Sequence, residues 1–214
     1  RMALIEGLIC YGPERDKKST FVLTEQWLPP FRAVAECDAQ RIVLQRYLRA
    51  FGPATPADFG KWSGIPAKAV RKIWAAAEGG LCEIATEQGA AWLLREDVDQ
   101  LAESVFAPKT LRLLPHFDPF LLGHVDKNQV VAATHYKRVY RAAGWIAPVI
   151  LHRGEAIGTW SHKKSRRALT VTLEPFDTLS SRLHSEIEAE IKSLGRFLDV
   201  SVDGIAIEIV NNTK

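Results

Sequence analysis

Cysteine is scarce in this sequence, and its few copies are scattered. Cys10, Cys37 and Cys82 form no CxxC pair, and no histidine lies near them at the spacing of a metal ligand. An odd, scattered set argues against a disulfide framework and against a zinc site, and it fits reduced thiols inside a cell. We therefore expect no metal, no cofactor and a cytoplasmic location.

Long apolar runs are missing as well. No stretch approaches the roughly 20 consecutive apolar residues that a membrane-spanning helix needs, and no signal peptide opens the sequence. The 214 residues, 47% of them hydrophobic, are enough for one large domain or two small ones. These properties predict a soluble protein without a membrane partner, and we expect a monomer.

Charge of one sign is not in large excess. The formal net charge is +3, which permits a nucleic-acid partner but does not by itself argue for one. A binding surface for DNA must therefore be sought segment by segment, wherever cations gather locally.

Residues 52 to 74 predict two short helices joined by a tight turn. Thr55 fits the cap of the first helix, with Pro56 at its first position. Gly64 ends that helix, and Pro66 opens the second one.

The flanking segments complete the order of a winged helix. Apolar spacing predicts a helix before this pair, and residues 81–95 predict two strands joined by a turn. We therefore expect a complete winged helix over residues 39–107. In this class the second helix of the pair enters the major groove. The outward face of that helix carries three candidate DNA-binding cations: Lys68, Arg71 and Lys72.

The same helix has plainer interpretations. Three helices and a hairpin can simply pack together, with the cations on a solvated face. Many winged helices also contact protein rather than DNA, and these three residues alone do not choose between the possibilities.

The first residues predict another hairpin. They read as the end of a helix, a strand, a charged turn over residues 12–18 and a returning strand. A lone two-stranded hairpin is only marginally stable, so we expect that part of the domain precedes residue 1. The order of elements resembles that of residues 79–96, which indicates an internal repeat. Residues 1–38 are thus expected to be the wing and linker of a truncated first winged helix. The turn supplies three more cations, which suit either a phosphate backbone or a solvated loop: Arg15, Lys17 and Lys18.

Residues 108–214 have a different composition and predict a C-terminal part made of a β-meander and a helix. Three strands, an amphipathic helix and a short closing strand are expected in that order. Glu186, Glu188 and Glu190 crowd the middle of this helix, so we do not expect it to face DNA.

Two cationic groups lie in this C-terminal part. The expected turn over residues 161–167 is the densest in the chain, and four cations there could each neutralise a phosphate: Lys163, Lys164, Arg166 and Arg167. A second segment, "THYKRVYRAAGW", alternates cations with Tyr136 and Tyr140, as nucleic-acid surfaces do. It also suits a plain amphipathic turn. Its candidate cations are Lys137, Arg138 and Arg141.

Histidine and aspartate occur together after residue 110, but their spacing does not predict a metal site. His116, Asp118, His124 and Asp126 match no recognised ligand pattern. Asp118 lies between an aromatic residue and a proline, where a turn or capping role is more common than catalysis.

Three ordered segments resemble the winged-helix DNA-binding family that includes the AlkZ/YcaQ-type DNA glycosylases. They are "RYLRAFGPATPADFGKWSGI", "LRLLPHFDPFLLG" and "VYRAAGWIAPVILHRGEAIGTW", and "EGLICYGPERDKKSTFVL" resembles the first wing of that family. The resemblance implies an α+β fold of tandem winged helix-turn-helix units with a C-terminal β-rich α/β part. It also implies a concave basic surface for double-stranded DNA. Some members excise alkylated bases and unhook interstrand crosslinks by cutting the N-glycosidic bond.

The resemblance does not extend to catalysis. Glycosylase members carry a Gln-x-Gln or Gln-x-Asp element near the start of the first winged helix, and none of the glutamines here has such a partner. That region is expected to precede residue 1, so no catalytic residue is assigned. Three functions stay open: a DNA-binding part of a glycosylase-like repair protein, a non-catalytic DNA-binding or regulatory protein, and a protein-interaction module.

Overall fold

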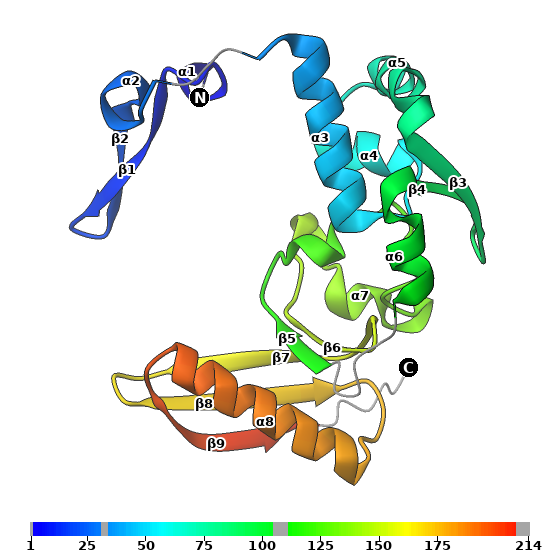
Figure 1. The fold of residues 1–214 in the computed structure, drawn as a ribbon. Coiled ribbons are helices and arrows are strands. Elements are labelled where there is room, and N and C mark those ends of the chain that lie inside the picture. Colours follow the sequence, from blue (N-terminus) through cyan, green and yellow to red (C-terminus); the bar gives the residue numbers. More distant parts are fainter. Residues whose placement is uncertain (1, 31–33, 105–110, 209–214) are drawn as a thin grey trace. The chain divides into compact units, whose positions relative to one another are not determined.

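The computed structural model describes residues 2–30, 34–104 and 111–208, which form a mixed α+β architecture. The α+β class expected from the sequence is thus confirmed. The chain divides into two compact units, Arg1–Gln40 and Arg41–Lys214 (Figure 1). Among the described residues, no helix has the length and apolar character needed to cross a membrane.

The first unit is an antiparallel hairpin with a short helix at each end. The sequence predicted a turn over residues 12–18, but β1 continues through Arg15 and the turn consists of Asp16 and Lys17. Both turn residues have positive φ, 51° and 61°, which is the conformation that a two-residue hairpin turn needs. The unit contains α1 (Met2–Ile5), β1 (Ile9–Arg15), β2 (Lys18–Leu23) and α2 (Thr24–Trp27).

The second unit opens with helices and a hairpin in the predicted order. Helix α4 begins where expected because Thr55 Oγ1 accepts the Asp58 N–H at 3.2 Å while Asp58 Oδ2 accepts the Thr55 N–H at 2.8 Å. Gly64, at φ 72°, ends that helix as predicted. The elements are α3 (Glu36–Phe51, which starts in the first unit), α4 (Pro56–Ser63), α5 (Ala67–Ala77), β3 (Leu81–Thr86), β4 (Gly89–Leu94) and α6 (Val98–Glu103).

An aromatic core joins the three helices. Tyr47 of α3 and Phe59 of α4 are buried with their ring centroids 5.3 Å apart, and Phe59 lies 6.3 Å from Trp74 of α5. Val70 and Ile73 complete the inner face of α5. Because this face is filled, the cations of α5 are left on the opposite face.

A five-stranded sheet forms the rest of the second unit. Its strand order is β5-β6-β7-β8-β9, with β9 parallel to β8 and all other pairs antiparallel. Helix α8 connects β8 to β9 along the chain and packs across one face of the sheet (Figure 1). It buries Ile187 and Ile191 against that face. The elements are β5 (Leu111–Leu114), α7 (Tyr136–Val139), β6 (Val149–His152), β7 (Glu155–Lys164), β8 (Ala168–Pro175), α8 (Ser181–Phe197) and β9 (Ser201–Ile207).

The turn predicted over residues 161–167 is shorter than expected. Lys163 and Lys164 continue β7, because they pair with Thr170 and Leu169 of β8. The ladder of hydrogen bonds overrides the polar composition of this stretch, so only residues 165–167 connect the two strands.

A long connection from β5 to β6 fastens the sheet to the helices. The Tyr47 hydroxyl donates to the Gly123 carbonyl at 2.7 Å, and the Val125 N–H donates to Asp58 Oδ1 at 2.7 Å. An added Cβ at Gly123 would lie 2.5 Å from the Phe51 ring, so no larger residue fits there. The domain boundary expected between residues 107 and 108 lies outside the described residues.

Candidate nucleic-acid interface

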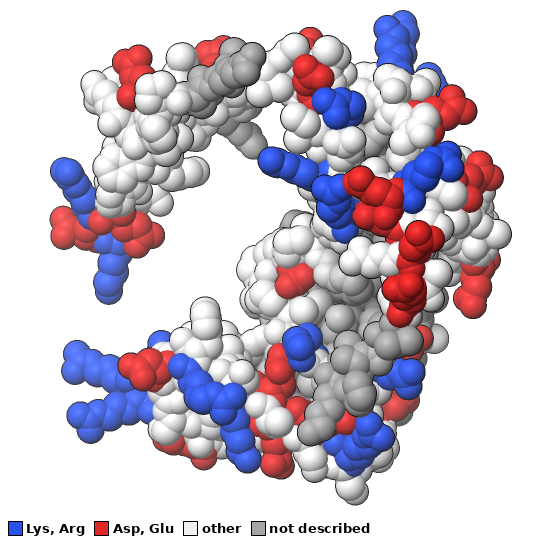
Figure 2. All heavy atoms as spheres, viewed as in Figure 1, with Lys and Arg blue, Asp and Glu red and all other residues white. Residues whose placement is uncertain are grey.

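Helix α5 presents the first candidate surface. Lys68, Arg71 and Lys72 are all exposed, and within the described part of the chain they form no ion pair. Figure 2 shows Lys and Arg side chains projecting from the end of the second unit where α5 lies. Their charges are therefore available to an anionic partner, whose counterions they would displace.

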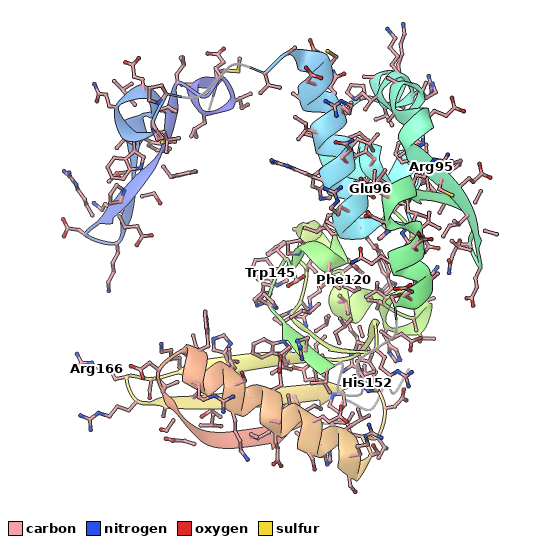
Figure 3. The ribbon with its side chains drawn as sticks, in the orientation of Figure 1. Arg95, Glu96, Phe120, Trp145, His152 and Arg166 are labelled. Carbon is pink, nitrogen blue, oxygen red and sulfur yellow. The ribbon has the colours of Figure 1, made fainter. Side chains whose placement is uncertain are left out.

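The end of the β7–β8 hairpin is the second candidate surface. Lys163, Lys164, Arg166 and Arg167 are exposed there, and the Lys164 ammonium donates to the Leu198 carbonyl at 3.1 Å. Arg166 lies at the outer end of the hairpin (Figure 3). Lys163 and Lys164 lie in the last rungs of the ladder and Arg166 and Arg167 in the connection, so four cations gather at one end of the hairpin.

The cations around α7 are more constrained. Arg138 is half-buried, with its guanidinium 4.6 Å from the centre of the Phe176 ring, and it donates to the Glu174 carbonyl at 3.3 Å. Arg141 Nε donates to the Arg138 carbonyl at 3.1 Å. Of the three predicted cations in this segment, Lys137 and Arg141 are exposed.

The two tyrosines of the same segment differ in their surroundings. Tyr140 donates its hydroxyl hydrogen to the Leu121 carbonyl at 3.0 Å, and burial, with a smaller contribution from Tyr136, raises its pKa to about 12. Tyr136 is exposed and stacks on Tyr140 with centroids 4.8 Å apart. Only Tyr136 therefore has surface free for stacking.

The hairpin of the first unit carries the remaining candidates. Arg15, Lys17 and Lys18 are exposed at the β1–β2 turn, where the tight turn places them next to Asp16. They belong to a unit of their own.

The two main cationic groups of the second unit are not neighbours. Helix α5 and the connected end of β7 and β8 lie at opposite ends of this unit (Figures 1 and 2). The fold thus gathers each group tightly but does not bring the two groups side by side.

A buried polar group lies between the helices and the β5–β6 connection. Burial alone would raise the pKa of Asp58, but hydrogen bonds from Thr55 and from the Val125 N–H lower this pKa below its ordinary value. Burial also lowers the pKa of Lys127, whose ammonium donates to the carbonyls of Leu121 and His124. These groups are all used inside the protein, so they fasten the connection to the start of α4.

The other histidine and aspartate residues of this segment also make local contacts. Asp118 accepts the Phe120 N–H at 2.9 Å, which confirms the capping role expected for it. Asp126 accepts the Asn128 N–H at 2.9 Å. Among the described residues, no three His, Cys, Asp or Glu side chains converge as a metal site would require.

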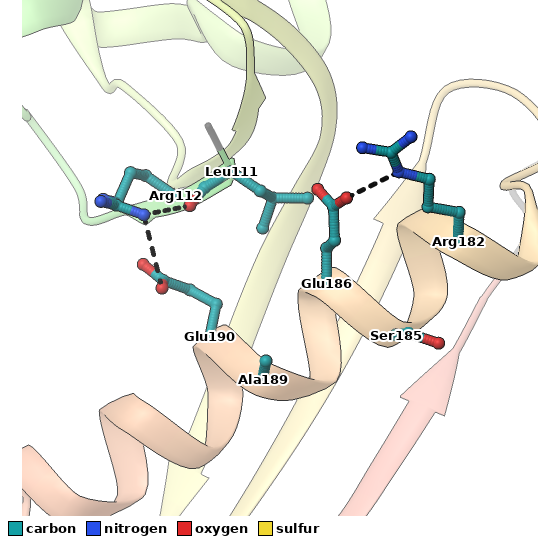
Figure 4. Close-up of a pocket in the computed structure, with 7 residues that line it drawn as sticks. All are labelled: Leu111, Arg112, Arg182, Ser185, Glu186, Ala189 and Glu190. Atoms are coloured by element: carbon teal, nitrogen blue, oxygen red, sulfur yellow. Dashed lines mark hydrogen bonds and ion pairs between the residues drawn. The ribbon is translucent and has the colours of Figure 1, made fainter. Parts of the chain in front are cut away.

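Helix α8 borders a pocket of about 550 Å³ against the edge strand β5 (Figure 4). Glu190 Oε2 lies 3.9 Å from Arg112 Nη1, and Glu186 Oε1 lies 3.0 Å from Arg182 Nε. The acidic side chains therefore meet cations of the protein itself. A phosphate backbone would have to compete with these ion pairs.

Sequence reasoning did not single out two exposed aromatic residues of the β5–β6 connection, Phe117 and Trp145. Both rings are more than two-fifths exposed and contact each other. The signal in the sequence was a tryptophan after two alanines and a glycine, in the stretch that also carries the cations around α7.

Comparisons with known proteins identify relatives that repair DNA. A family model described as "DNA glycosylase AlkZ-like" matches residues 1–197. The chain is 35% identical over 202 residues to the interstrand DNA cross-link repair glycosylase of Streptomyces sahachiroi, covering 91% of this chain and 53% of that protein. The solved structure of Streptomyces sahachiroi DNA glycosylase AlkZ matches with a TM-score of 0.78 and 33% identity, over 95% of this chain and 55% of that one. The chain thus spans about half the length of the curated relative it matches.

Proposed function

Because this chain belongs to the AlkZ-like DNA glycosylase family, we propose that it binds duplex DNA within a glycosylase-like repair protein that acts on alkylated or crosslinked bases. The observation that carries this proposal is the outer face of α5. Three exposed cations lie on the second helix of a tight helical pair, without an ion-pair partner in the described part of the chain.

The proposal includes an architecture of tandem winged helices. Residues 39–107 would form a complete winged helix, with α5 as its recognition helix and β3–β4 as its wing. Residues 1–38 would supply the wing and linker of another such unit, and residues 108–214 the C-terminal β-rich part. The element order and the hairpin that directly follows α5 support this division.

Each cationic group has a role in the proposed complex. The α5 residues and the β7–β8 residues would neutralise phosphates, as would Lys137, Arg141 and the cations of the β1–β2 turn. Arg138 would help to hold the segment in place, because its guanidinium already lies over Phe176.

Fluorescence anisotropy with a labelled undamaged duplex tests the binding step. We expect the affinity to fall steeply as salt rises, with little dependence on sequence, because phosphate contacts release counterions. Affinity that does not change with salt would remove the basis of the proposal.

The repair step requires a second experiment. Duplexes with an alkylated purine or an interstrand crosslink are incubated with the complete protein that contains this chain, and release of the base is measured. We expect excision. Duplex binding without excision would instead assign a non-catalytic, regulatory role to the same fold.

A further inference from the structure

Three aromatic rings form an exposed cluster on the β5–β6 connection. Trp145 lies 5.0 Å from Phe117 in an edge-to-face arrangement and 4.9 Å from His116, measured between ring centroids. Trp145 is 46% exposed and Phe117 is 42% exposed. We call these three residues the aromatic platform. Figure 3 shows Trp145 on the β5–β6 connection.

The backbone holds the platform in an unusual conformation. Phe117 has a φ of 57°, in the left-handed region that bulky side chains rarely occupy. Ala143, at 56°, and Gly144, at 74°, make a second left-handed turn just before Trp145. Strained residues of this kind persist where the surrounding structure determines them, and they gather at binding sites.

Hydrogen bonds fix both ends of the platform. His116 Nδ1 lies 3.0 Å from the Ile146 carbonyl, and the Arg141 N–H donates to the Trp145 carbonyl at 2.7 Å. These bonds hold the His116 ring and the backbone of Trp145 in position. Because Trp145 and Phe117 leave more than two-fifths of their surface in solvent, part of the stabilisation that full burial would provide is absent.

The surroundings of the platform suit a nucleic-acid strand. Exposed Arg141 adjoins it, and the intervening Ala142, Ala143 and Gly144 are exposed and small. A sugar-phosphate backbone can approach such a stretch closely, with the cation beside it. Aromatic faces accept any base, because every base has a π-face.

We propose that the aromatic platform stacks against a nucleobase that has left the duplex stack at a distorted site. This inference rests on the proposed function, and it adds Phe117 and Trp145 as positioning residues. Stacking would stabilise an unstacked base at a damaged site and leave a perfectly paired duplex without a ring contact.

The test compares two duplexes that differ by one unpaired thymine. The full chain and its W145A variant are titrated with a perfectly paired duplex and with the same duplex carrying the bulge. We expect the wild type to prefer the bulged duplex, and W145A to lose about tenfold in affinity for it with little change for the paired one. F197A is the matched control and should change neither value, because Phe197 is 84% exposed at the end of α8 and lies outside the platform.

Two more variants separate stacking from folding. W145F retains a π-face and should keep most of the preference, whereas W145L retains apolar bulk alone and should lose it. Urea unfolding of each variant shows whether the fold is intact. If W145L binds the bulged duplex as tightly as W145F does, the stacking inference is wrong.

The outcomes also distinguish this inference from the proposed function. If the wild type binds both duplexes equally, the platform has no role in recognising an unstacked base, although duplex binding stands. If the wild type binds neither duplex, the proposed function itself fails. If W145A abolishes self-association and leaves both DNA affinities unchanged, the platform is a protein contact.

Discussion

Asp58 is a single residue that serves two parts of the fold. One carboxylate oxygen closes the capping box with Thr55, and the other accepts the Val125 N–H. D58A should therefore lower the free energy of unfolding by roughly 3 kcal/mol, because the N–H groups of Thr55 and Val125 both lose their acceptor. D58N, which keeps an oxygen acceptor, should lose less. Urea unfolding at neutral pH measures both, and an equal loss in the two variants would contradict this division of roles.

The same carboxylate predicts a pH dependence of stability. Its pKa in the folded protein is lower than the ordinary value of about 3.9 that applies in the unfolded chain. The unfolded chain therefore takes up the proton at higher pH, so the stabilisation is complete above about pH 4 and is lost as the pH falls through the lowered pKa. The gap in unfolding free energy between wild type and D58N should narrow below about pH 4. A gap that stays constant down to about pH 3 would show that the charge of Asp58 contributes nothing.

Ala143 provides a test of backbone strain. Its φ of 56° disfavours every residue with a Cβ, so A143G should raise the free energy of unfolding by about 1 kcal/mol. Ala142, on the same exposed turn, is the control. Its φ is not in the positive region, so A142G should lower stability by several tenths of a kcal/mol to about 1. Thermal unfolding checks the opposite signs, and a loss of stability in both variants would refute the strain at Ala143.

At the scale of elements, α5 and α8 can be compared directly as surfaces for DNA. R71E/K72E should weaken duplex binding and reduce the slope of log affinity against log salt by about 0.9 for each phosphate that is no longer neutralised. K192E/R196E makes the same change of charge on exposed positions of α8, and it should change the slope little. Anisotropy titrations over a range of salt concentrations measure both. Equal effects from the two helices would show that only net charge matters.

Element boundaries could be predicted where local chemistry sets them. Thr55, Pro56 and Gly64 fix the limits of α4 through capping and a left-handed glycine, and these limits are confirmed. The end of β7 could not be predicted in this way. Lys163 and Lys164 extend that strand because residues of β8 pair with them, and such pairing depends on the partner strand rather than on local composition.

The candidate site could be predicted only in part, for a similar reason. The sequence reveals where cations gather, and it placed the α5 group on an outward face, where the structure has it. It could not reveal that Arg138 lies over Phe176. Nor could it show that the partly exposed rings of Phe117 and Trp145, 28 positions apart, contact each other. Both features arise from contacts between distant segments.

At the scale of the whole second unit, the placement of its two cationic groups predicts how binding depends on duplex length. Helix α5 and the β7–β8 end lie at opposite ends of the unit (Figure 2). Because the two groups lie at opposite ends, we expect a duplex of about 30 base pairs, near three helical turns, to reach both groups more readily than one of about 12 base pairs. The salt dependence should accordingly be steeper for the longer duplex.

Charge reversal of each group turns this expectation into a decisive comparison. On the longer duplex, R71E/K72E and R166E/R167E should each weaken binding, and their free-energy losses should add when combined, because distant sites act independently. On the shorter duplex, either change alone should have little effect, since the other group still binds, and only the combined variant should lose binding. Anisotropy titrations at one fixed salt concentration measure all eight affinities, those of the wild type and the three variants on each duplex. If the losses of the single variants are the same on both duplexes, the two groups do not share one length of DNA, and each would have to serve a separate partner.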